Sequence, residues 1–463
     1  MDPSINLKPT AVRHVVAMPL PGRGHINPMM NLCKLIASKT NDVLVTFVVT
    51  EEWLGFIGSD AKPDNLGFAS IPNVIPSELV RGVEFPRFYE AVMTKMEVPF
   101  EQLLDRLDPP VTNIITDSEL FWAIRIGNCR NIPVASLCTT SATFFSKLHY
   151  FGTIQDQHSL ADLLGKGDEI LDIPAAVSST DVSDIRTIYG ASGRGVMQLA
   201  LKGHSWVQKS QYLLFNSVYE LEAQVFGTLE TKFSFPIYPI GPVIPYFELK
   251  DNFCTNISPD GPNYQEWLNF QPTGSVLYVS LGSFHSVSSE QMDEISAGLK
   301  NSGVRYLWVA RGETCRLQKS CGDMGLVVPW CDQLKVLCHS SVGGFWTHCG
   351  WNSTLEALFA GIPMITFPIT YDQVPNSEKI VQDWKIGWRL RGRGGDENSV
   401  SREEIAEIVQ KFMDKESIEV QEMRKRARKF REICDGATAK GGTSGENLDA
   451  FIKEISQGHI TIE

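Results

Sequence analysis

Short runs of β-branched residues alternate with helical patterns along this chain, and the alternation runs twice. Candidate strands in the first half are residues 14–18, 43–49, 113–116 and 212–215, and those in the second half are residues 275–280, 306–309, 326–328, 344–347 and 364–367. Helical patterns such as that of residues 290–300 separate them. This alternation is typical of parallel sheets with crossover helices, so the sequence predicts an α/β protein.

The length fits two domains better than one. A chain of 463 residues is about three times as long as a usual domain. Between the two halves lie residues 239–245 and 250–263, whose prolines and glycines are typical of a linker. We therefore place the boundary near residue 246 and expect an N-terminal domain of residues 1–246 and a C-terminal domain of residues 247–444.

Two helices near the end of the chain can be read in detail. Ser401 and Glu404 form a capping box, and apolar residues then recur at helical spacing up to Phe412. In a final helix over residues 445–458, one face carries Leu448, Phe451, Ile452 and Ile455. This face needs an apolar surface to cover, but the spacing does not say which domain supplies it.

Composition excludes several classes of protein. Hydrophobic residues make up 43% and charged residues 21% of the chain, which is ordinary for a globular protein. A net charge of −12 argues against nucleic acid or an anionic membrane as the main partner. The ten cysteines contain no C-x-x-C pair, and the first apolar run is too short for a signal core or a membrane span. We expect a cytoplasmic protein with free thiols, no structural metal and no integral membrane segment.

The first candidate site follows the first strand. Gly22, Gly24, His25 and Pro28 lie between that strand and a helix that Pro28 could open at its first turn. The segment fails as a dinucleotide fingerprint because Asn27 replaces the third glycine. His25 alone would more often be a satisfied loop histidine, but the carboxyl end of a parallel strand is where such sheets bind ligands. A histidine there titrates near neutral pH.

The second candidate is Asp117, at the end of an apolar strand. Alone, an aspartate in this place is more often the N-cap of the next helix. Paired with His25 from a neighbouring strand, it could accept the imidazole N–H, fix the tautomer and stabilise the imidazolium. Such a pair can activate a hydroxyl group.

The third candidate combines an anion site with a carboxylate and aromatic rings. Gly350, Asn352 and Ser353 lie at a predicted strand–turn–helix junction, where free backbone N–H groups could bind a diphosphate. His348 adds a donor, and Glu356 could accept two ribose hydroxyls. Core packing is the usual role of single tryptophans such as Trp330 and Trp351, although this alternative weakens when rings, anion site and carboxylate share one crevice.

These residues carry a resemblance. Residues 330–373, forty-four in number, resemble the signature box of plant secondary-product UDP-glycosyltransferases. The His25 loop, the strand end at Asp117, residues 280–283 and the glycine-rich residues 441–445 fit the same family. The likeness covers nearly the whole chain. It implies a GT-B fold, in which two Rossmann-like domains face each other across a cleft and the last helix returns to the N-terminal domain.

The resemblance also implies roles for individual residues. Trp330 would stack on uracil, Cys331 and Gln333 would lie at the nucleoside, and Glu356 would hold the ribose. The diphosphate would be bound at Gly350 by Ser283, His348, Asn352 and Ser353. The sugar would contact Thr139, Trp351, Asp372 and Gln373. Within the family, Trp351 together with a terminal Gln373 indicates a glucose donor, while pentose and galactose donors stay open.

The sequence departs from the family pattern in two places. The box usually begins Trp-Ala-Pro-Gln, whereas Cys331 and Asp332 stand here between Trp330 and Gln333. A carboxylate near an anionic ligand should repel it unless it points to solvent. The other departure is Glu119, where the family often has an apolar residue lining the acceptor site. It could bind a polar group of the acceptor or turn outward.

The function expected from the resemblance is inverting transfer of glucose from UDP-glucose to a hydroxyl of a small lipophilic acceptor. His25 would act as the general base, oriented by Asp117, in a monomer that uses no metal or cofactor. Two alternatives are a nucleotide-sugar-binding protein without turnover and an NAD-dependent oxidoreductase. Acceptor choice should depend on the N-terminal domain, around residues that could equally be core: Phe88, Met93, Trp122, Phe144 and Phe145.

Overall fold

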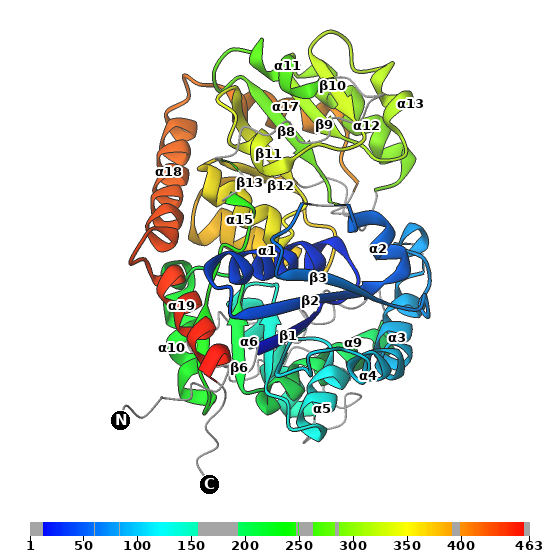
Figure 1. The fold of residues 1–463 in the computed structure, drawn as a ribbon. Coiled ribbons are helices and arrows are strands. Elements are labelled where there is room, and N and C mark those ends of the chain that lie inside the picture. Colours follow the sequence, from blue (N-terminus) through cyan, green and yellow to red (C-terminus); the bar gives the residue numbers. More distant parts are fainter. Residues whose placement is uncertain are drawn as a thin grey trace, which may run out of the picture.

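Two parallel sheets, one in each half of the sequence, organise the molecule (Figure 1). The computed structural model describes residues 13–59, 61–82, 84–155, 193–246, 249, 263–282, 287–390 and 399–457. We call the part built on the first sheet the N-lobe and the part built on the second sheet the C-lobe. In Figure 1 the N-lobe lies below the C-lobe.

The N-lobe sheet has seven strands in the order β3-β2-β1-β4-β5-β6-β7, all parallel. The strands are β1 (Arg13–Met18), β2 (Val43–Thr50), β3 (Leu66–Ile71), β4 (Asn113–Asp117), β5 (Val134–Cys138), β6 (Tyr212–Phe215) and β7 (Ile237–Pro239). Alternate residues face opposite sides: Val15 and Ala17 pack into one apolar cluster, and Val16 and Met18 pack into another. Both faces are therefore buried, as parallel sheets require.

Helices cover the two faces of this sheet. One face packs against α1 (Arg23–Lys39) and α2 (Glu51–Ile57). The opposite face packs against α3 (Phe85–Lys95), α4 (Glu97–Leu104), α5 (Phe121–Cys129), α6 (Ala142–Gln155) and α9 (Gly193–Trp206). Further elements of the N-lobe are η1 (Glu78–Val80), η2 (Val207–Lys209) and α10 (Tyr219–Lys232).

The C-lobe repeats this arrangement with six parallel strands in the order β10-β9-β8-β11-β12-β13. They are β8 (Val276–Ser280), β9 (Arg305–Val309), β10 (Gly325–Val328), β11 (Val342–Thr347), β12 (Met364–Thr366) and β13 (Gly387–Arg389). The helices of this lobe are α11 (Tyr264–Asn269), α12 (Ser289–Asn301), α13 (Thr314–Gln318), α14 (Gln333–Leu337), α15 (Trp351–Ala360), α16 (Gln373–Glu378), the π-helix η4 (Lys379–Asp383), α17 (Arg402–Met413) and α18 (Ile418–Thr438).

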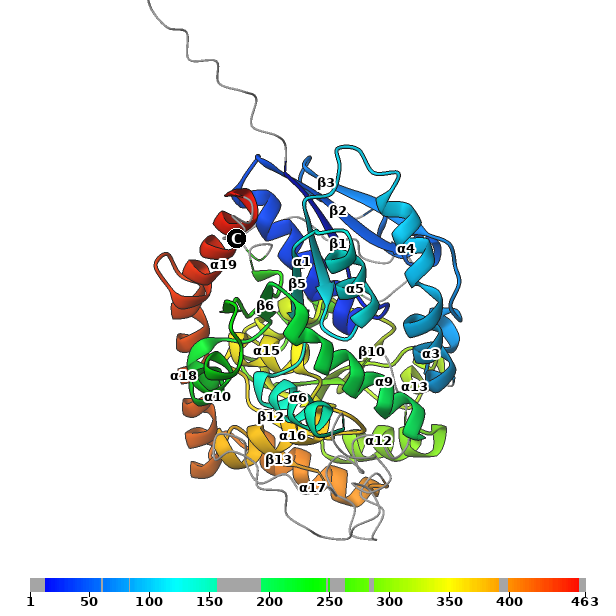
Figure 2. The ribbon, with the colours of Figure 1, turned by 90° about the horizontal axis from the view of Figure 1, so that it is seen from below.

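The final helix, α19 (Thr443–Gln457), returns to the N-lobe. Its apolar face, Leu448, Phe451, Ile452 and Ile455, belongs to the same cluster as residues of β1, β2 and α1. In Figures 1 and 2, α18 runs along one edge of the molecule from the C-lobe toward α19, and α19 contacts β7 of the N-lobe sheet. The N-lobe therefore supplies the apolar surface that the helical spacing of α19 demanded.

The expected elements are largely present. All nine expected strands lie within two residues of observed ones, and the capping box of Ser401 and Glu404 begins α17. Strands β3, β5, β7 and β13 were not expected. The limits of the two domains stay a prediction, with the two sheets lying on either side of residue 246. Among the described residues, no helix is both long enough and apolar enough to cross a bilayer.

The first stretch expected as a linker, residues 239–245, is packed instead, and all of the second, residues 250–263, except Asn263 lies outside the described residues. Ile240, Val243 and Ile244 are buried, at most 5% exposed. The carbonyl of Val243 accepts a hydrogen bond from Asn31 on α1, 3.3 Å away. Three apolar residues among the prolines give this stretch enough apolar surface to pack, so composition alone misjudged it.

Candidate active site

His25 and Asp117 meet where the strand order of the N-lobe sheet reverses. Strand β1 has β2 on one side and β4 on the other, so the crevice at the carboxyl ends of β1 and β4 is a topological switch point. His25 lies in the first turn of α1, just after β1, and Asp117 is the last residue of β4. The topology therefore brings together two residues that are far apart in the sequence.

The two side chains are hydrogen bonded. Asp117 Oδ2 lies 2.7 Å from His25 Nδ1, and Thr139 Oγ1 lies 3.0 Å from the same nitrogen. The Asp117 side chain is 1% exposed and that of His25 is 22% exposed. An ionised carboxylate can only accept, so Nδ1 carries the proton and Nε2 is left as the accepting nitrogen. Asp117 is not the N-cap of α5, because that position is Leu120.

The surroundings of His25 favour its protonated form. Burial lowers the pKa of His25, but the charge of Asp117 and the hydrogen bond to it act in the opposite direction, and Glu119 adds to them. The pKa of His25 is consequently raised above its ordinary value. An imidazole held in this way is a stronger base than a free one, which suits proton removal from a hydroxyl.

Helix α1 begins earlier than the sequence indicated. It starts at Arg23 with Gly22 as N-cap, so Pro28 lies inside the helix rather than in its first turn. Proline has no N–H, and the carbonyl of Gly24 therefore loses its partner four residues ahead. Asn352 Nδ2 of the C-lobe donates to this carbonyl at 2.7 Å. The missing helix hydrogen bond is thus replaced by a contact between the lobes.

The C-lobe offers an anion site at the start of α15. The order of the C-lobe sheet reverses between β8 and β11, and α15 follows β11 directly. Its N-cap is Gly350, no side chain caps the helix, and the first turn contains no acidic residue. The first N–H groups of α15 and the positive end of the helix dipole are therefore available to a negatively charged ligand.

Two glycines enclose the imidazole of His348. A Cβ atom on Gly282 would lie 2.7 Å from His348 Nε2, and one on Gly350 would lie 2.6 Å from it. Gly282 also has a φ of +88°, which side chains rarely adopt. Only glycine at both positions leaves room for this ring beside the start of α15. Ser283, the remaining residue expected at the diphosphate, lies outside the described residues.

The residues expected at the nucleoside and ribose come from the segment before α14, from α14 and from α15. Trp330 is 48% exposed, so the core alternative is wrong for this tryptophan. Gln333 Nε2 donates to Ser353 Oγ at 3.0 Å and to Glu356 Oε2 at 2.6 Å. Burial raises the pKa of Glu356 to about 7, the Gln333 hydrogen bond lowers it, and the charge of Asp332 raises it. The carboxylate of Glu356 therefore changes charge near neutral pH.

The two unusual residues at the start of the box, Cys331 and Asp332, have structural partners. Asp332 caps α14, accepting from the Lys335 N–H at 3.2 Å, and its other oxygen lies 3.4 Å from Lys335 Nζ. Its own N–H, which a proline would lack, donates to Tyr264 Oη at 3.2 Å. Cys331 is buried beside Tyr278 Oη at 3.4 Å, and burial raises the pKa of its thiol to about 12. The Asp332 charge is thus held by helix and lysine, and the thiol stays neutral.

The residues expected at the sugar lie between the lobes. Gln373 Oε1 accepts from the N–H groups of Ile369 and Thr370, which leaves its amide nitrogen as the group that can donate to a ligand. Burial raises the pKa of Asp372 to about 6, while the Asn376 hydrogen bond and the charge of His25 lower it. Tyr371, next to Asp372, meets Phe85 of α3 with ring centroids 5.4 Å apart, which places this segment at the interface between the lobes.

Trp351 and Asn352 connect the lobes through a residue that the sequence analysis missed. Trp351 is 2% exposed, and its indole N–H donates to the carbonyl of Asn216 at 2.6 Å. Asn216 Nδ2 donates in turn to Asn352 Oδ1 at 2.9 Å. The core alternative therefore describes Trp351 well. A polar residue directly after strand β6 is the signal that could have indicated Asn216.

A buried arginine near the His25 loop was also missed. Arg81 is 6% exposed, donates to the carbonyl of Pro21 at 3.1 Å and pairs with Glu78 at 3.0 Å. A Cβ atom on Gly22 would collide with its guanidinium. Burial lowers the pKa of Arg81, and the charge of Glu78 opposes this effect. No motif in the sequence surrounds Arg81, so nothing indicated its position.

The aromatic residues expected around the acceptor are core residues. Phe88, Met93, Trp122, Phe144 and Phe145 are each at most 4% exposed and pack inside apolar clusters. Partly buried rings lie instead between the lobes. Phe85 of α3 meets Tyr371 of the C-lobe with ring centroids 5.4 Å apart.

Three ligand atoms of the N-lobe lie close enough to hold a cation. A ring nitrogen of His25 and carboxylate oxygens of Asp117 and Glu119 all lie within 4.8 Å of one another. Among the described residues no other group of three such side chains was found. Because His25 Nδ1 is already bonded to Asp117, a cation would compete with this hydrogen bond.

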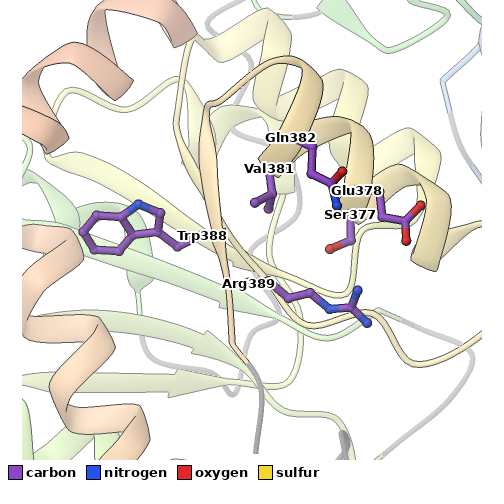
Figure 3. A pocket seen from close by; sticks show the side chains of 6 residues that line it. All are labelled: Ser377, Glu378, Val381, Gln382, Trp388 and Arg389. Atoms are coloured by element: carbon purple, nitrogen blue, oxygen red, sulfur yellow. The ribbon is translucent and has the colours of Figure 1, made fainter. Parts of the chain in front are cut away.

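A separate pocket of about 380 Å³ lies in the C-lobe. Figure 3 shows its lining, with Ser377, Glu378, Val381 and Gln382 on the helical segment α16–η4 and Trp388 and Arg389 on β13. Glu378 and Arg389 give it both charges. None of its six lining residues is a candidate site residue, so the pocket has no part in the site described above.

Comparisons with known proteins agree with the fold and the site. UGT2 of Phytolacca americana, solved with UDP-2fluoro-glucose and pterostilbene, superposes with a TM-score of 0.78 at 26% identity, covering 96% of this chain and 99% of that one. Medicago truncatula UGT71G1, solved with UDP-glucose, gives a TM-score of 0.77 at 25% identity, covering 96% and 98%. The protein therefore has the GT-B fold, with two Rossmann-like domains.

Sequence comparison gives the family. The model described as UDP-glucoronosyl and UDP-glucosyl transferase matches residues 207–424. UDP-glycosyltransferase 87A2 of Arabidopsis thaliana is 49% identical over 459 residues, which cover 98% of this chain and 99% of that protein. The chain belongs to the UDP-glycosyltransferase family. It is an enzyme of the hexosyltransferase class that transfers a sugar from a UDP-sugar to an acceptor. The protein is therefore neither a sugar-binding protein without turnover nor an oxidoreductase.

Proposed function

We propose that this enzyme transfers glucose from UDP-glucose to a hydroxyl of a small lipophilic acceptor with inversion at the anomeric carbon. His25 Nε2 takes the acceptor proton while the acceptor oxygen attacks that carbon from the face opposite UDP. The new carbon–oxygen bond forms as the bond to the diphosphate breaks, and UDP leaves with the electron pair. The products are a β-glucoside, UDP and an imidazolium that returns its proton to water.

One observation carries this proposal: the hydrogen-bonded pair of His25 and Asp117 is joined across the lobes to the anion site at the start of α15. His25 Nδ1 lies 2.7 Å from Asp117, and the Gly24 carbonyl next to His25 accepts from Asn352 in the first turn of α15. A sugar whose diphosphate is bound at α15 would therefore present its anomeric carbon near His25. Donors fixed in advance at the leaving group stabilise its developing charge.

The proposed residue roles follow the family resemblance. Trp330, Cys331 and Gln333 would contact the nucleoside, and Glu356 the ribose. Ser283, His348, Gly350, Asn352 and Ser353 would hold the diphosphate, and Thr139, Trp351, Asp372 and Gln373 the sugar. We assign no metal or cofactor to the reaction and expect a monomer in the cytoplasm. The relatives solved with UDP-glucose and UDP-2fluoro-glucose support glucose as the donor sugar.

Replacing His25 tests the mechanism. A positioned base contributes roughly 10²–10⁴-fold to the rate, so we expect His25→Ala to reduce kcat by about that factor. The Kd for UDP-glucose should stay near that of the unchanged enzyme, because His25 contacts the acceptor. His339→Ala is a matched control, since the His339 side chain bonds Ser341 and Asn269, which are not site residues.

Turnover with a panel of alcohols and UDP-sugars, followed by NMR of the products, measures all three parts of the proposal. Full activity of His25→Ala would contradict the base, and an α-linked product would contradict inversion. Faster turnover with another UDP-sugar would contradict glucose as the donor.

A further inference from the structure

We propose that Glu119 recognises the acceptor by binding a second hydroxyl adjacent to the one that is glucosylated. Neutral acceptors with two neighbouring hydroxyls, such as a catechol ring, would then be the preferred substrates. This inference rests on the proposed function, because it takes His25 as the base that meets the reacting hydroxyl.

The Glu119 side chain is held toward the site. The backbone N–H of Glu119 donates to Asp117 Oδ1 at 3.1 Å, and the side-chain Oε2 of Glu119 accepts from Tyr89 Oη at 2.6 Å. Helix α9 packs closely against this turn, since a Cβ atom on Gly203 would lie 2.6 Å from the Glu119 carbonyl. The outward orientation left open by the sequence is therefore wrong.

The spacing of the acceptor groups fits two adjacent hydroxyls. A His25 nitrogen and a Glu119 oxygen lie within 4.8 Å of each other. A hydroxyl hydrogen bond is about 2.7–2.8 Å long, so two groups this close can each receive one of two neighbouring hydroxyls. Tyr89 occupies one Glu119 oxygen, and the other can accept from the ligand.

The charges around Glu119 favour an acceptor substrate that is neutral. Burial raises the pKa of Glu119, the charge of His25 and the Tyr89 hydrogen bond lower it, and the charge of Asp117 raises it. Glu119 also raises the pKa of Asp372 across the interface. Asp117 and Glu119 both have a carboxylate oxygen within 4.8 Å of a His25 nitrogen, so an acceptor with its own carboxylate would be repelled.

Aromatic rings beside Glu119 suit a flat acceptor. The Phe85 ring centroid lies 5.6 Å from that of Tyr89 and 5.4 Å from that of Tyr371. Phe85 and Tyr371 are partly buried, at the interface between the lobes. A ring packed against these side chains keeps its apolar part dry while its hydroxyls reach His25 and Glu119.

Paired acceptors test this role. We would measure kcat/KM with UDP-glucose for catechol and for phenol, which lacks only the second hydroxyl. A hydrogen bond to a charged group corresponds to roughly 10–100-fold, so the unchanged enzyme should prefer catechol by about that factor beyond the statistical factor of about two. In Glu119→Leu the preference should fall toward that statistical value, and Glu119→Gln should lie between.

The ratio of kcat/KM for catechol to kcat/KM for phenol separates recognition of the second hydroxyl from other effects of the substitution. If Glu119 acted only through the charge of His25, both acceptors would lose activity by the same factor, and this result would overturn the inference. Glu90→Gln, an exposed position on α3 next to Tyr89, should keep the preference of the unchanged enzyme. Because the ratio is taken within one preparation, partial misfolding cancels, and Glu119→Gln carries the test if Glu119→Leu does not fold.

The same assay distinguishes this inference from the proposed function. Equal use of catechol and phenol by the unchanged enzyme would overturn the role of Glu119 and leave glucosyl transfer intact. No glucoside from any alcohol in the panel would instead overturn the proposed function.

Discussion

At the scale of single residues, Glu356 is a buried site residue whose charge changes near neutral pH. Burial raises its pKa to about 7, against the lowering effect of the Gln333 hydrogen bond. A raised carboxyl pKa means that the group is neutral below about pH 7 and ionised above it. The ionised form is the better acceptor for ribose hydroxyls.

We therefore expect UDP-glucose to bind more tightly as the pH rises from about 6 to 8, by up to about tenfold. Titration calorimetry without acceptor measures this directly, and the diphosphate of UDP-glucose stays fully ionised in this range. In Glu356→Gln the dependence should be lost, because the amide does not titrate. An unchanged pH dependence in that variant would assign the effect to another group.

The sequence predicted which residues gather at the site better than how their side chains point. Trp330 and Trp351 belong to the same motif, yet one is 48% exposed and the other is 2% exposed. The difference arises because Trp351 bonds to Asn216, 135 positions away in the other lobe. Contacts of this kind depend on how the lobes pack, which no local pattern records.

At the scale of elements, the junction of β11 and α15 depends on glycine at defined places. His348 fills the space that a Cβ atom on Gly350 would need. Gly350 has a φ of −58°, which alanine can adopt, so its role is steric rather than conformational.

We expect Gly350→Ala to displace His348 and to weaken UDP-glucose binding by about tenfold or more, as for loss of a hydrogen bond to a charged group. Gly436→Ala in α18 is the matched control, since a Cβ atom there meets nothing within 4 Å. It should leave binding unchanged and stabilise the fold by about 0.5–1 kcal/mol. Equal affinities of both variants would show that His348 does not contribute to binding.

Strands were predicted where their residues are intrinsically suited to sheets, and missed elsewhere. β2 is rich in valine and threonine, whereas β5 contains one β-branched residue, Val134. β5 is nevertheless fully buried between β4 and β6. Its conformation is imposed by its neighbours, because strand preference depends strongly on context.

At the scale of the whole molecule, the last helix belongs to the core of the first lobe. Phe451 is fully buried, with its ring centroid 5.7 Å from that of Tyr212 and 6.0 Å from that of Tyr238. The N-lobe is therefore completed only when the chain has passed through the C-lobe.

We expect Phe451→Ala to destabilise the N-lobe by about 3–5 kcal/mol. In calorimetric unfolding, the transition temperature of the N-lobe should fall, while UDP-glucose should raise the transition temperature of the C-lobe. Phe270→Ala, at a position that is 78% exposed, should change stability by no more than about 0.5 kcal/mol. If both variants were equally stable, α19 would not be part of the N-lobe core.

The two places where the chain passes between the lobes are tied to each other. Ser444 donates to the carbonyl of Gly241, and Asn447 Nδ2 donates to the carbonyl of Pro239 at 2.9 Å. A body connected twice along one edge can swing about that edge but cannot slide freely. If the lobes separate, we therefore expect a rotation about this edge, with ligands entering along the opposite side.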